Sequence, residues 1–277
     1  MQEITLKELL EAGCHFGHEV RRWHPKADRY IYGERNGIHI IDLAKTKEGL
    51  DRAREYVKKL GEAGKVVMFV GTKRQSSQII KSEAVRVGAC YFDKRWVGGF
   101  ITNWGEIKKT LDKLNRMEEE KAKGEWQKFP KHEQLKLGRE RLKLEKFYGG
   151  VKKLKELPEA LFIADSRNEK TAVNECISSG IPIVAISDTN CDPTKITYPI
   201  PANDDGVKSI SLIVKTIAGA YFEGKEAGKK MAVTQEKKTQ ETPPAKVVAE
   251  AEKSQDKIKK EKKVKKKADK KKKNKKP

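Results

Sequence analysis

Three polar motifs follow apolar segments of the chain, and such positions can hold an active site. They are Gly71-Thr72-Lys73-Arg74, Asp165-Ser166-Arg167-Asn168 and Asp188-Thr189-Asn190. In an open parallel sheet, ligands bind beyond the carboxyl ends of the strands, so these motifs could together bind a phosphorylated small molecule. The first motif matches neither glycine-rich nucleotide pattern, and short acids after strands more often cap the next helix. We therefore expect that the protein is not an enzyme. The alternative is an enzyme that binds a phosphorylated small molecule at the strand ends.

Cysteine and histidine side chains near the N-terminus raise the question of a metal site. Cys14, His15 and His18 lie close together, and His24 follows. Structural zinc sites usually take four ligands in paired spacing, and the chain offers no second pair. We therefore predict no metal and no cofactor, and expect His15 and His18 to pack in a turn between glycines. The four scattered cysteines are typical of reduced thiols in the cytosol.

Two clusters combine arginine, lysine and tryptophan. One is Arg21-Arg22-Trp23-His24-Pro25-Lys26, and the other is Lys94-Arg95-Trp96 before Gly98-Gly99. Arginine forks bind phosphate, and flat rings stack on exposed bases, although either tryptophan could instead belong to the core. Together with the strand-end motifs, they give the candidate RNA-binding residues Arg21, Arg22, Trp23, His24, Lys26, Lys73, Arg74, Lys94, Arg95, Trp96 and Arg167.

Net charge favours a polyanionic partner. The formal net charge is +21, and residues 231–277 hold 18 lysines against 7 acidic residues. Because each neutralised phosphate releases counterions, RNA suits this field better than an acidic membrane. The C-terminal segment contains no arginine and should be disordered, so its binding would be diffuse. The segment either binds RNA or keeps the protein soluble. A second alternative function is that of a general RNA chaperone that acts mainly through this segment.

No segment favours a membrane or an export route. The longest apolar run, Val66–Val70, is far shorter than the roughly 20 residues that span a bilayer. The first five residues also lack the basic and apolar regions of a signal peptide. We therefore expect a cytoplasmic protein with no membrane partner.

The remaining pattern predicts an α/β fold that positions these motifs. Thr5-Leu6-Lys7-Glu8 is typical of a capping box, and Asn36-Gly37 predicts a hairpin leading to the first sheet strand. After a helix from Leu50, strands and helices alternate, which predicts a parallel sheet covered on both faces. The predicted strands are 66–70, 89–92, 160–164 and 183–187, and the predicted helices are 76–87, 168–178 and one from Val207.

One highly charged segment interrupts this alternation. Of residues 106–156, 26 are charged, and the apolar positions form a thin stripe with a seven-residue spacing. This indicates two antiparallel helices in a coiled-coil hairpin, unless the segment is merely a solvated excursion. The predicted domains are a discontinuous sheet domain of residues 1–104 and 157–228, an inserted hairpin of residues 105–156, and a disordered lysine-rich tail of residues 229–277.

Several motifs together resemble one protein family. The stretch from Leu9 to His18, the motifs Trp23-His24-Pro25-Lys26 and Phe69-Val70-Gly71-Thr72-Lys73-Arg74-Gln75, and Arg95-Trp96-Val97-Gly98-Gly99 look like the bacterial type of the small-subunit ribosomal protein S2 family. Further matches are Pro158–Asp165, Asp188-Thr189-Asn190-Cys191-Asp192-Pro193 and Tyr198–Asp205. The resemblance covers roughly residues 3–225, in order, including the inserted hairpin.

This resemblance implies a fold, a function and partners. It implies a flavodoxin-like three-layer fold with about five parallel strands and a protruding helical hairpin, and a structural role without catalytic residues. It also implies binding to small-subunit ribosomal RNA near the junction of head and body, next to neighbouring ribosomal proteins and to the mRNA-binding ribosomal protein S1 where the organism has one. The protein would then be ribosome-bound, with no small-molecule substrate.

Overall fold

The computed structural model describes residues 4–240, with side chains for residues 4–230. Its first element is α1 (Leu6–Glu11), which begins with the predicted capping box. The Glu8 backbone N–H donates to Thr5 Oγ1, and the Glu8 carboxylate accepts from the Thr5 backbone N–H at 2.7 Å. Gly13, at φ +74°, closes the turn after the helix. Leu9 is buried, so this helix packs on the body through one leucine face.

A small antiparallel sheet follows, in the order β1-β3-β2. It consists of β1 (Phe16–Glu19), β2 (Ile31–Arg35) and β3 (Ile38–Ile41), with the short 3-10 helices η1 (Val20–Arg22) and η2 (Pro25–Tyr30) between β1 and β2. Positive φ angles at Asn36 and Gly37 confirm the predicted hairpin turn. The expectation that this hairpin leads into the main sheet was wrong, because β3 pairs with β1 and β2 alone and a helix follows it.

The main sheet has five parallel strands in the order β5-β4-β6-β7-β8. They are β4 (Val67–Val70), β5 (Cys90–Phe92), β6 (Ala160–Ile163), β7 (Ile183–Ser187) and β8 (Tyr198–Pro201). Numbered along the chain, the strands lie in the order 2-1-3-4-5, the arrangement of flavodoxin-like folds. The predicted parallel α/β class is therefore confirmed, and the topology is compatible with the flavodoxin-like type.

Strand β8 was not predicted from the apolar pattern. Its sequence, Tyr198-Pro199-Ile200-Pro201, contains two residues that cannot donate a backbone hydrogen bond. The strand lies at the edge of the sheet and pairs with β7. Proline is tolerated at an edge because one side of the strand needs no donor. This explains how a segment that resembles a loop completes the sheet.

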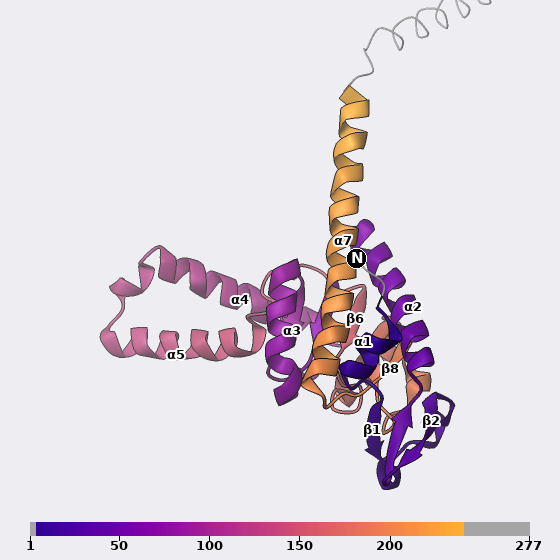
Figure 1. Ribbon diagram of the computed structural model, residues 1–277. Helices are drawn as coiled ribbons and strands as arrows, with labels where there is room; N and C mark the ends of the chain where they lie inside the picture. Colours follow the sequence, from indigo (N-terminus) through magenta and orange to yellow (C-terminus); the bar gives the residue numbers. More distant parts are fainter. Residues whose placement is uncertain (1–3, 241–277) are drawn as a thin grey trace, which may run out of the picture. The chain divides into compact units, whose positions relative to one another are not determined.

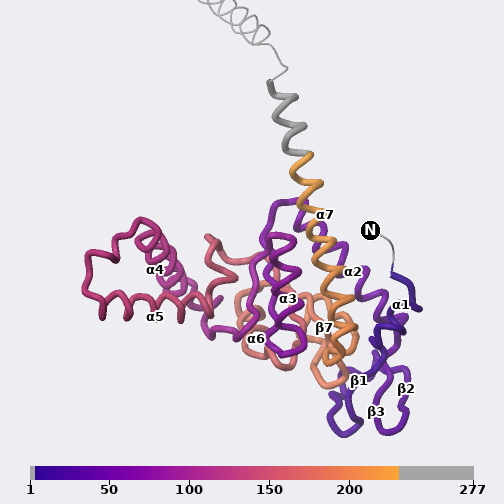
Figure 2. Tube along the Cα trace, turned by 60° about the vertical axis from the view of Figure 1, so that its left-hand side comes forward, coloured from indigo at the N-terminus to yellow at the C-terminus, as the bar shows by residue number. Residues whose placement is uncertain are grey.

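Helices cover both faces of this sheet (Figure 1 and Figure 2). Along β4, Val67 and Phe69 belong to the core beneath α2 (Leu43–Glu62), α3 (Arg74–Val87) and α7 (Val207–Gln240). The alternate residues Met68 and Val70 belong to a second core that includes α6 (Lys170–Ser179). This alternation is the period-two pattern of a strand buried on both faces.

The charged insertion forms the helices α4 (Trp104–Ala122) and α5 (Lys131–Tyr148), with a 3-10 turn, η3 (Glu125–Lys128), between them. Figure 1 shows α4 and α5 running antiparallel. At the base of the insertion, Ile107 and Leu111 are buried in the second core together with Val151. No described residue of α5 is buried, so a coiled-coil seam along the whole hairpin stays a prediction.

The compact unit that contains both sheets ends at Gly228. Helix α7 is described as far as Gln240, and the disorder expected for residues 229–277 stays a prediction. The lysine-rich runs of the predicted tail lie outside the described residues. Among the helices of residues 4–240, none combines the length and the apolar character needed to cross a membrane.

Candidate nucleic-acid interface and strand-end cluster

The carboxyl ends of β4, β6, β7 and β8 converge on one polar cluster. Lys73, after β4, places its Nζ 3.0 Å from Asp165 Oδ2 and 3.2 Å from Asp204 Oδ1, and it also pairs with Asp205. Asp165 follows β6, while Asp204 and Asp205 follow β8. The parallel strands thus bring together side chains that the sequence separates widely. We call His18, Lys73, Asp165, Asp188, Asp204 and Asp205 the strand-end cluster.

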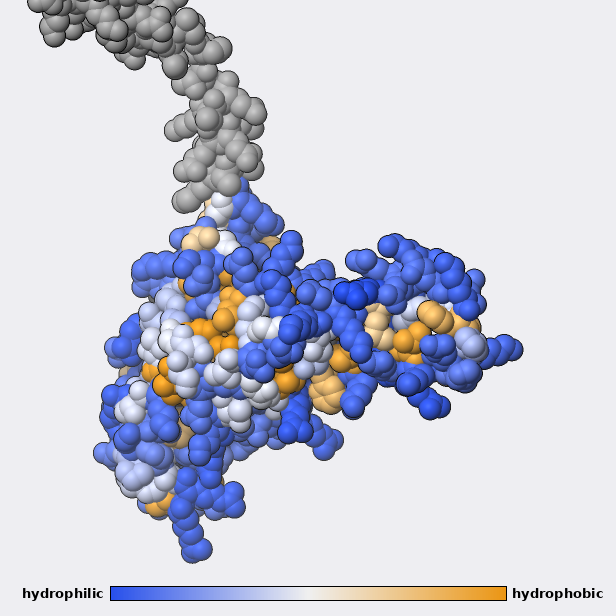
Figure 3. Space-filling view, turned by 180° about the vertical axis from the view of Figure 1, so that it is seen from behind, coloured by the Kyte–Doolittle hydropathy of each residue, from blue (hydrophilic) through white to orange (hydrophobic). Residues whose placement is uncertain are grey.

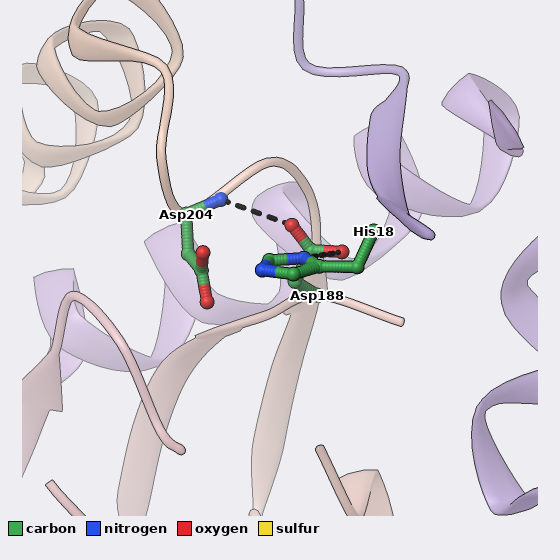
Figure 4. Close-up of side chains that lie close together, drawn as sticks. All are labelled: His18, Asp188 and Asp204. Carbon is green, nitrogen blue, oxygen red and sulfur yellow. Dashed lines mark hydrogen bonds and ion pairs between the residues drawn. The ribbon is translucent and has the colours of Figure 1, made fainter. Parts of the chain in front are cut away.

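His18 enters this cluster from β1 of the small sheet (Figure 4). Its Nδ1 lies 3.1 Å from Asp188 Oδ1, and its Nε2 lies 3.3 Å from Asp205 Oδ2. The side chains of Asp188 and Asp204 are 1% and 2% exposed. The Asp204 backbone N–H donates to Asp188 Oδ2 at 3.3 Å, which holds the loops after β7 and β8 together.

The electrostatics of the strand-end cluster are acidic. Burial raises the pKa of Asp204 to about 7, and the nearby Asp165 and Asp188 act in the same direction. The neighbouring Asp188 carboxylate raises the pKa of His18. Four carboxylates here face the ammonium group of Lys73 and the imidazole of His18. Such a site repels phosphate, which removes the basis for a phosphorylated substrate at the strand ends.

Lys73 therefore differs from the phosphate-binding lysine that the sequence suggested. Its side chain is 24% exposed and held by three aspartates, so its charge is already neutralised. Burial opposes the charged form, but the three carboxylates outweigh it and raise the pKa of Lys73. Lys73 is an ion-pair centre between loops of the protein itself, and its predicted contact with RNA stays a prediction. Its neighbour Arg74 is exposed at the start of α3.

Trp96 belongs to the core, the alternative that the sequence had left open. It is 6% exposed and lies edge-on to Phe92 and Phe100. Its Nε1–H donates to a carboxylate oxygen of Glu175 on α6 at 3.0 Å. The ring is therefore not available to stack on a base. Trp23, by contrast, is 38% exposed, and its ring centre lies 5.4 Å from that of His39.

Two of the other predicted residues, His24 and Arg167, line a pocket beside the strand-end cluster. Arg21, Arg22 and Trp23 are exposed, and the His24 backbone N–H donates to the Thr189 carbonyl oxygen at 2.8 Å. This bond places the η1–η2 segment against the loop after β7. Lys26 also reaches this loop, where its Nζ lies 2.9 Å from Asp192 Oδ2.

The pocket itself has a volume of about 280 Å³. His24 and Arg167 line it as predicted residues, and Lys170 and Lys195 line it as residues that the sequence analysis missed. We call these four residues and Asn190 the basic pocket. Lys170 follows Arg167 by three residues, so the sequence did indicate that the two side chains lie close together. Lys195 reaches the pocket only because the fold brings its segment there. Asn190 Oδ1 is buried without a hydrogen-bond partner among the described residues.

The second predicted cluster lies at the base of the helical insertion. Arg95 lines a pocket of about 400 Å³ together with Lys143, Phe147 and Tyr148 of α5. Lys94 is exposed and its Nζ lies 3.6 Å from Asp93. The two predicted basic clusters therefore occupy separate places on the fold, and Lys143 is a further residue that the sequence analysis missed.

The histidines and Cys14 do not form the zinc group considered from their sequence spacing. Cys14 is fully buried in the first core, and His24 lines the basic pocket. Within residues 4–230, the group of side chains with metal-ligand spacing is His18, Asp188 and Asp204, whose ligand atoms lie within 4.8 Å of one another. The two aspartates could not be found from local spacing, since each follows a different strand.

Known proteins resemble this chain over most of its length. The family model described as Ribosomal protein S2 matches residues 9–224. A relative from Dictyoglomus thermophilum, named small ribosomal subunit protein uS2, is 50% identical over 232 residues, which are 84% of this chain and 94% of the relative. A protein of the same name from Synechococcus sp. (strain JA-3-3Ab) is 49% identical over 225 residues, 81% of this chain and 84% of the relative. The chain therefore belongs to the ribosomal protein S2 family, in its bacterial type.

Proposed function

We propose that this protein is a structural constituent of the small ribosomal subunit and binds ribosomal RNA. The observation that carries the proposal is the group of exposed basic and aromatic side chains around the basic pocket, next to strand ends that are acidic. Two relatives, about half identical, are named as small ribosomal subunit proteins, and neither is named as an enzyme. The acidic strand ends lack the charge that a phosphorylated substrate needs, which agrees with a non-enzymatic role.

The basic pocket suits the chemistry of an RNA backbone. Arg167 offers a planar fork to phosphate oxygens, and Lys170 and Lys195 add two further positive charges. Asn190 Oδ1 needs a hydrogen-bond donor, which a ribose 2′-hydroxyl supplies and a phosphate diester does not. Trp23 beside the pocket leaves part of its ring exposed for stacking on a base. These groups together favour folded RNA over a simple anion.

The helical insertion provides a second arm in this proposal. Arg95 and Lys143 border the pocket at its base, and Phe147 and Tyr148 line its apolar wall. The face of the molecule seen in Figure 3 is mainly hydrophilic, over the sheet domain and over the insertion. Contacts at both places would hold RNA elements together that otherwise move independently. Phosphate contacts of this kind fix position and orientation, while base contacts add specificity.

We further propose a cytoplasmic, ribosome-bound location near the head and body junction of the small subunit. Neighbouring ribosomal proteins would be its protein partners, with ribosomal protein S1 among them where the organism has one. The formal net charge of +21 supports a polyanionic environment. The lysine-rich residues 241–277 would add a diffuse, salt-sensitive attraction to this specific contact.

Charge reversal tests the proposal directly. A variant with Arg21, Arg22, Arg95 and Arg167 changed to glutamate should be depleted from small subunits in gradient fractions after a high-salt wash. A control with four exposed residues elsewhere reversed, Arg52, Lys58, Lys81 and Lys108, should retain its place, provided that both variants keep wild-type circular dichroism. Equal occupancy of the two folded variants would refute the proposed interface.

A tail deletion distinguishes specific docking from general RNA binding. Removing residues 241–277 should lower affinity for unrelated RNAs and leave occupancy in the small subunit nearly unchanged. Loss of small-subunit occupancy on deletion would instead support a chaperone that acts through its tail.

A further inference from the structure

We propose that the basic pocket binds one unstacked nucleotide of the RNA and recognises its ribose 2′-hydroxyl. This inference rests on the proposed function and deepens it, because it names the part of an RNA chain that enters the pocket. At about 280 Å³, the pocket lies at the lower end of the range for ligand pockets, so it has room for one nucleotide and not for a base pair. Its walls differ in chemistry, and each wall matches one part of a nucleotide.

The basic rim of the pocket matches the phosphate group. Arg167, Lys170 and Lys195 line the pocket, all three are exposed, and none forms an ion pair with a residue that the structure describes. A carboxylate, that of Asp192, lines the same pocket. It is neutralised by Lys26, whose Nζ lies 2.9 Å from Asp192 Oδ2. The rim therefore keeps a positive charge that attracts the phosphate of an RNA backbone.

Two residues that line the pocket carry polar atoms without a hydrogen-bond partner. The atoms are Ser166 Oγ and Asn190 Oδ1, and both are buried with no partner among the described residues. The residue Ser166 as a whole is only 8% exposed. A buried polar atom that lacks a partner costs free energy, so two such atoms at one pocket point to a polar group of a ligand.

A ribose 2′-hydroxyl supplies the donor that Asn190 lacks. The Oδ1 atom of Asn190 only accepts hydrogen bonds, and the oxygens of a phosphate diester do the same, so phosphate alone does not satisfy it. A hydroxyl group both donates and accepts, and the 2′-hydroxyl therefore donates to Asn190. The hydroxyl of Ser166 pairs with another oxygen of the same nucleotide. Because deoxyribose has no hydroxyl at this position, Asn190 distinguishes RNA from DNA.

The remaining wall of the pocket is apolar and contacts the flat part of the nucleotide. Val173 of α6 and Ile196 line this wall, and both belong to the second core. A base stacked inside a double helix does not reach such a wall, so the nucleotide must come from a loop or a bulge, where bases turn out of the stack. Phosphate, sugar and base each meet a suitable wall, which favours a whole nucleotide over a phosphate ion.

Titration of the full-length protein with mononucleotides tests the contact apart from the ribosome. The probes are the four nucleoside 5′-monophosphates, their 2′-deoxy counterparts and inorganic phosphate, with binding followed by NMR. At least one ribonucleotide should bind about fivefold more tightly than its deoxy counterpart, the factor expected of one hydrogen bond, and more tightly than phosphate. Asn190→Leu should abolish this preference, and Arg167→Met should weaken both forms equally. Gln78→Leu, an exposed amide on α3, is the matched control and should bind as the wild type does.

Chemical acylation of 2′-hydroxyls in small subunits identifies the source of the nucleotide. One nucleotide of the ribosomal RNA should be protected by the wild-type protein and by Gln78→Leu, and should become reactive with Asn190→Leu. Failure of every ribonucleotide to bind the folded wild type, or equal binding of ribonucleotides, deoxyribonucleotides and phosphate, would overturn the 2′-hydroxyl contact without needing any variant. A ribose preference with no protected RNA nucleotide would assign the pocket to a free nucleotide and overturn RNA as the ligand. The charge-reversal experiment measures small-subunit occupancy, so a failed 2′-hydroxyl contact and a failed RNA interface give different results.

Discussion

Replacing Glu175 with glutamine should destabilise the protein strongly, because this one carboxylate holds the segment that presents Arg95. Glu175 lies on α6 and is 8% exposed. Its Oε1 accepts from Trp96 Nε1–H at 3.0 Å and from the Gly99 backbone N–H at 2.8 Å. Its Oε2 accepts from the backbone N–H groups of Ile101 and Thr102 at 3.0 and 3.4 Å.

Glutamine keeps the shape of this side chain but changes its capacity to accept hydrogen bonds. One oxygen becomes an NH₂ group, so two of the four donors lose their acceptor and face another donor. Hydrogen bonds to charged groups contribute about 1.5–3 kcal/mol each, which predicts a loss of roughly 3–5 kcal/mol in the free energy of unfolding. With a urea dependence of about 3 kcal/mol per molar, the midpoint should fall by about 1–1.7 M.

Urea unfolding followed by far-ultraviolet circular dichroism measures this loss. Glu34→Gln is the matched control, since Glu34 is exposed on β2 and its replacement should change stability by less than about 0.5 kcal/mol. Equal midpoints for the two variants would show that the Glu175 carboxylate does not hold the loop, and the assignment of Trp96 to this buried network would then lose its support.

Two further predictions follow from helix packing and from one ion pair. Gly224→Ala should cost about 2–3 kcal/mol by calorimetry, because the new methyl group overlaps a carbonyl oxygen of α2, while Gly105→Ala on α4 meets open space and should be neutral or stabilising. Burial opposes ionisation of Asp192, but hydrogen bonds from Thr194 and Lys26 outweigh it and lower its pKa to about 2. Its contribution to stability is therefore present above pH 3.8 and is lost as the pH falls through about 2. Lys26→Met should raise this pKa in an NMR titration, and an unchanged value would contradict the pairing.

Acidic and basic side chains occupy different places in this protein, and this separation supports the proposed function. The strand ends, where α/β enzymes hold their ligands, are filled by aspartates that pair with Lys73 and His18. Beside them, around the basic pocket, lie Arg167, Lys170 and Lys195, which form no ion pair with the residues that the structure describes. The fold thus uses its strand ends to bind its own loops together and places these basic side chains on the periphery, where the proposed contact with RNA would form.

Local sequence patterns predicted most of the secondary structure. The capping box at Thr5 and the hairpin at Asn36-Gly37 depend on residues a few positions apart, so their signals are complete in the sequence. The buried strands β4, β6 and β7 are continuous apolar runs, which a parallel sheet requires. Strand β8 escaped because its two prolines are acceptable only at a sheet edge, and edge position is decided by neighbouring strands.

Side-chain roles were harder to predict than elements, since the same residue type serves different purposes in different surroundings. Lys73 and Arg167 both follow buried strands, but three aspartates surround the first and a basic pocket surrounds the second. Trp23 and Trp96 both follow an arginine, but the second has Glu175 and two phenylalanines around it. The two members of each pair differ in burial and in contacting residues, and both properties depend on segments that are distant in the sequence.

The sequence by itself determined the α/β class, the parallel order of most elements, the inserted helices and the family, because periodicity, caps and motifs are local properties. Only the tertiary structure decided which charges are free. It brought His18 of β1 beside Asp188 and Asp204, and it enclosed Lys73 among carboxylates from two other strands. The physical reason is that electrostatic interactions act through space at a few ångströms, whereas sequence patterns record only distance along the chain.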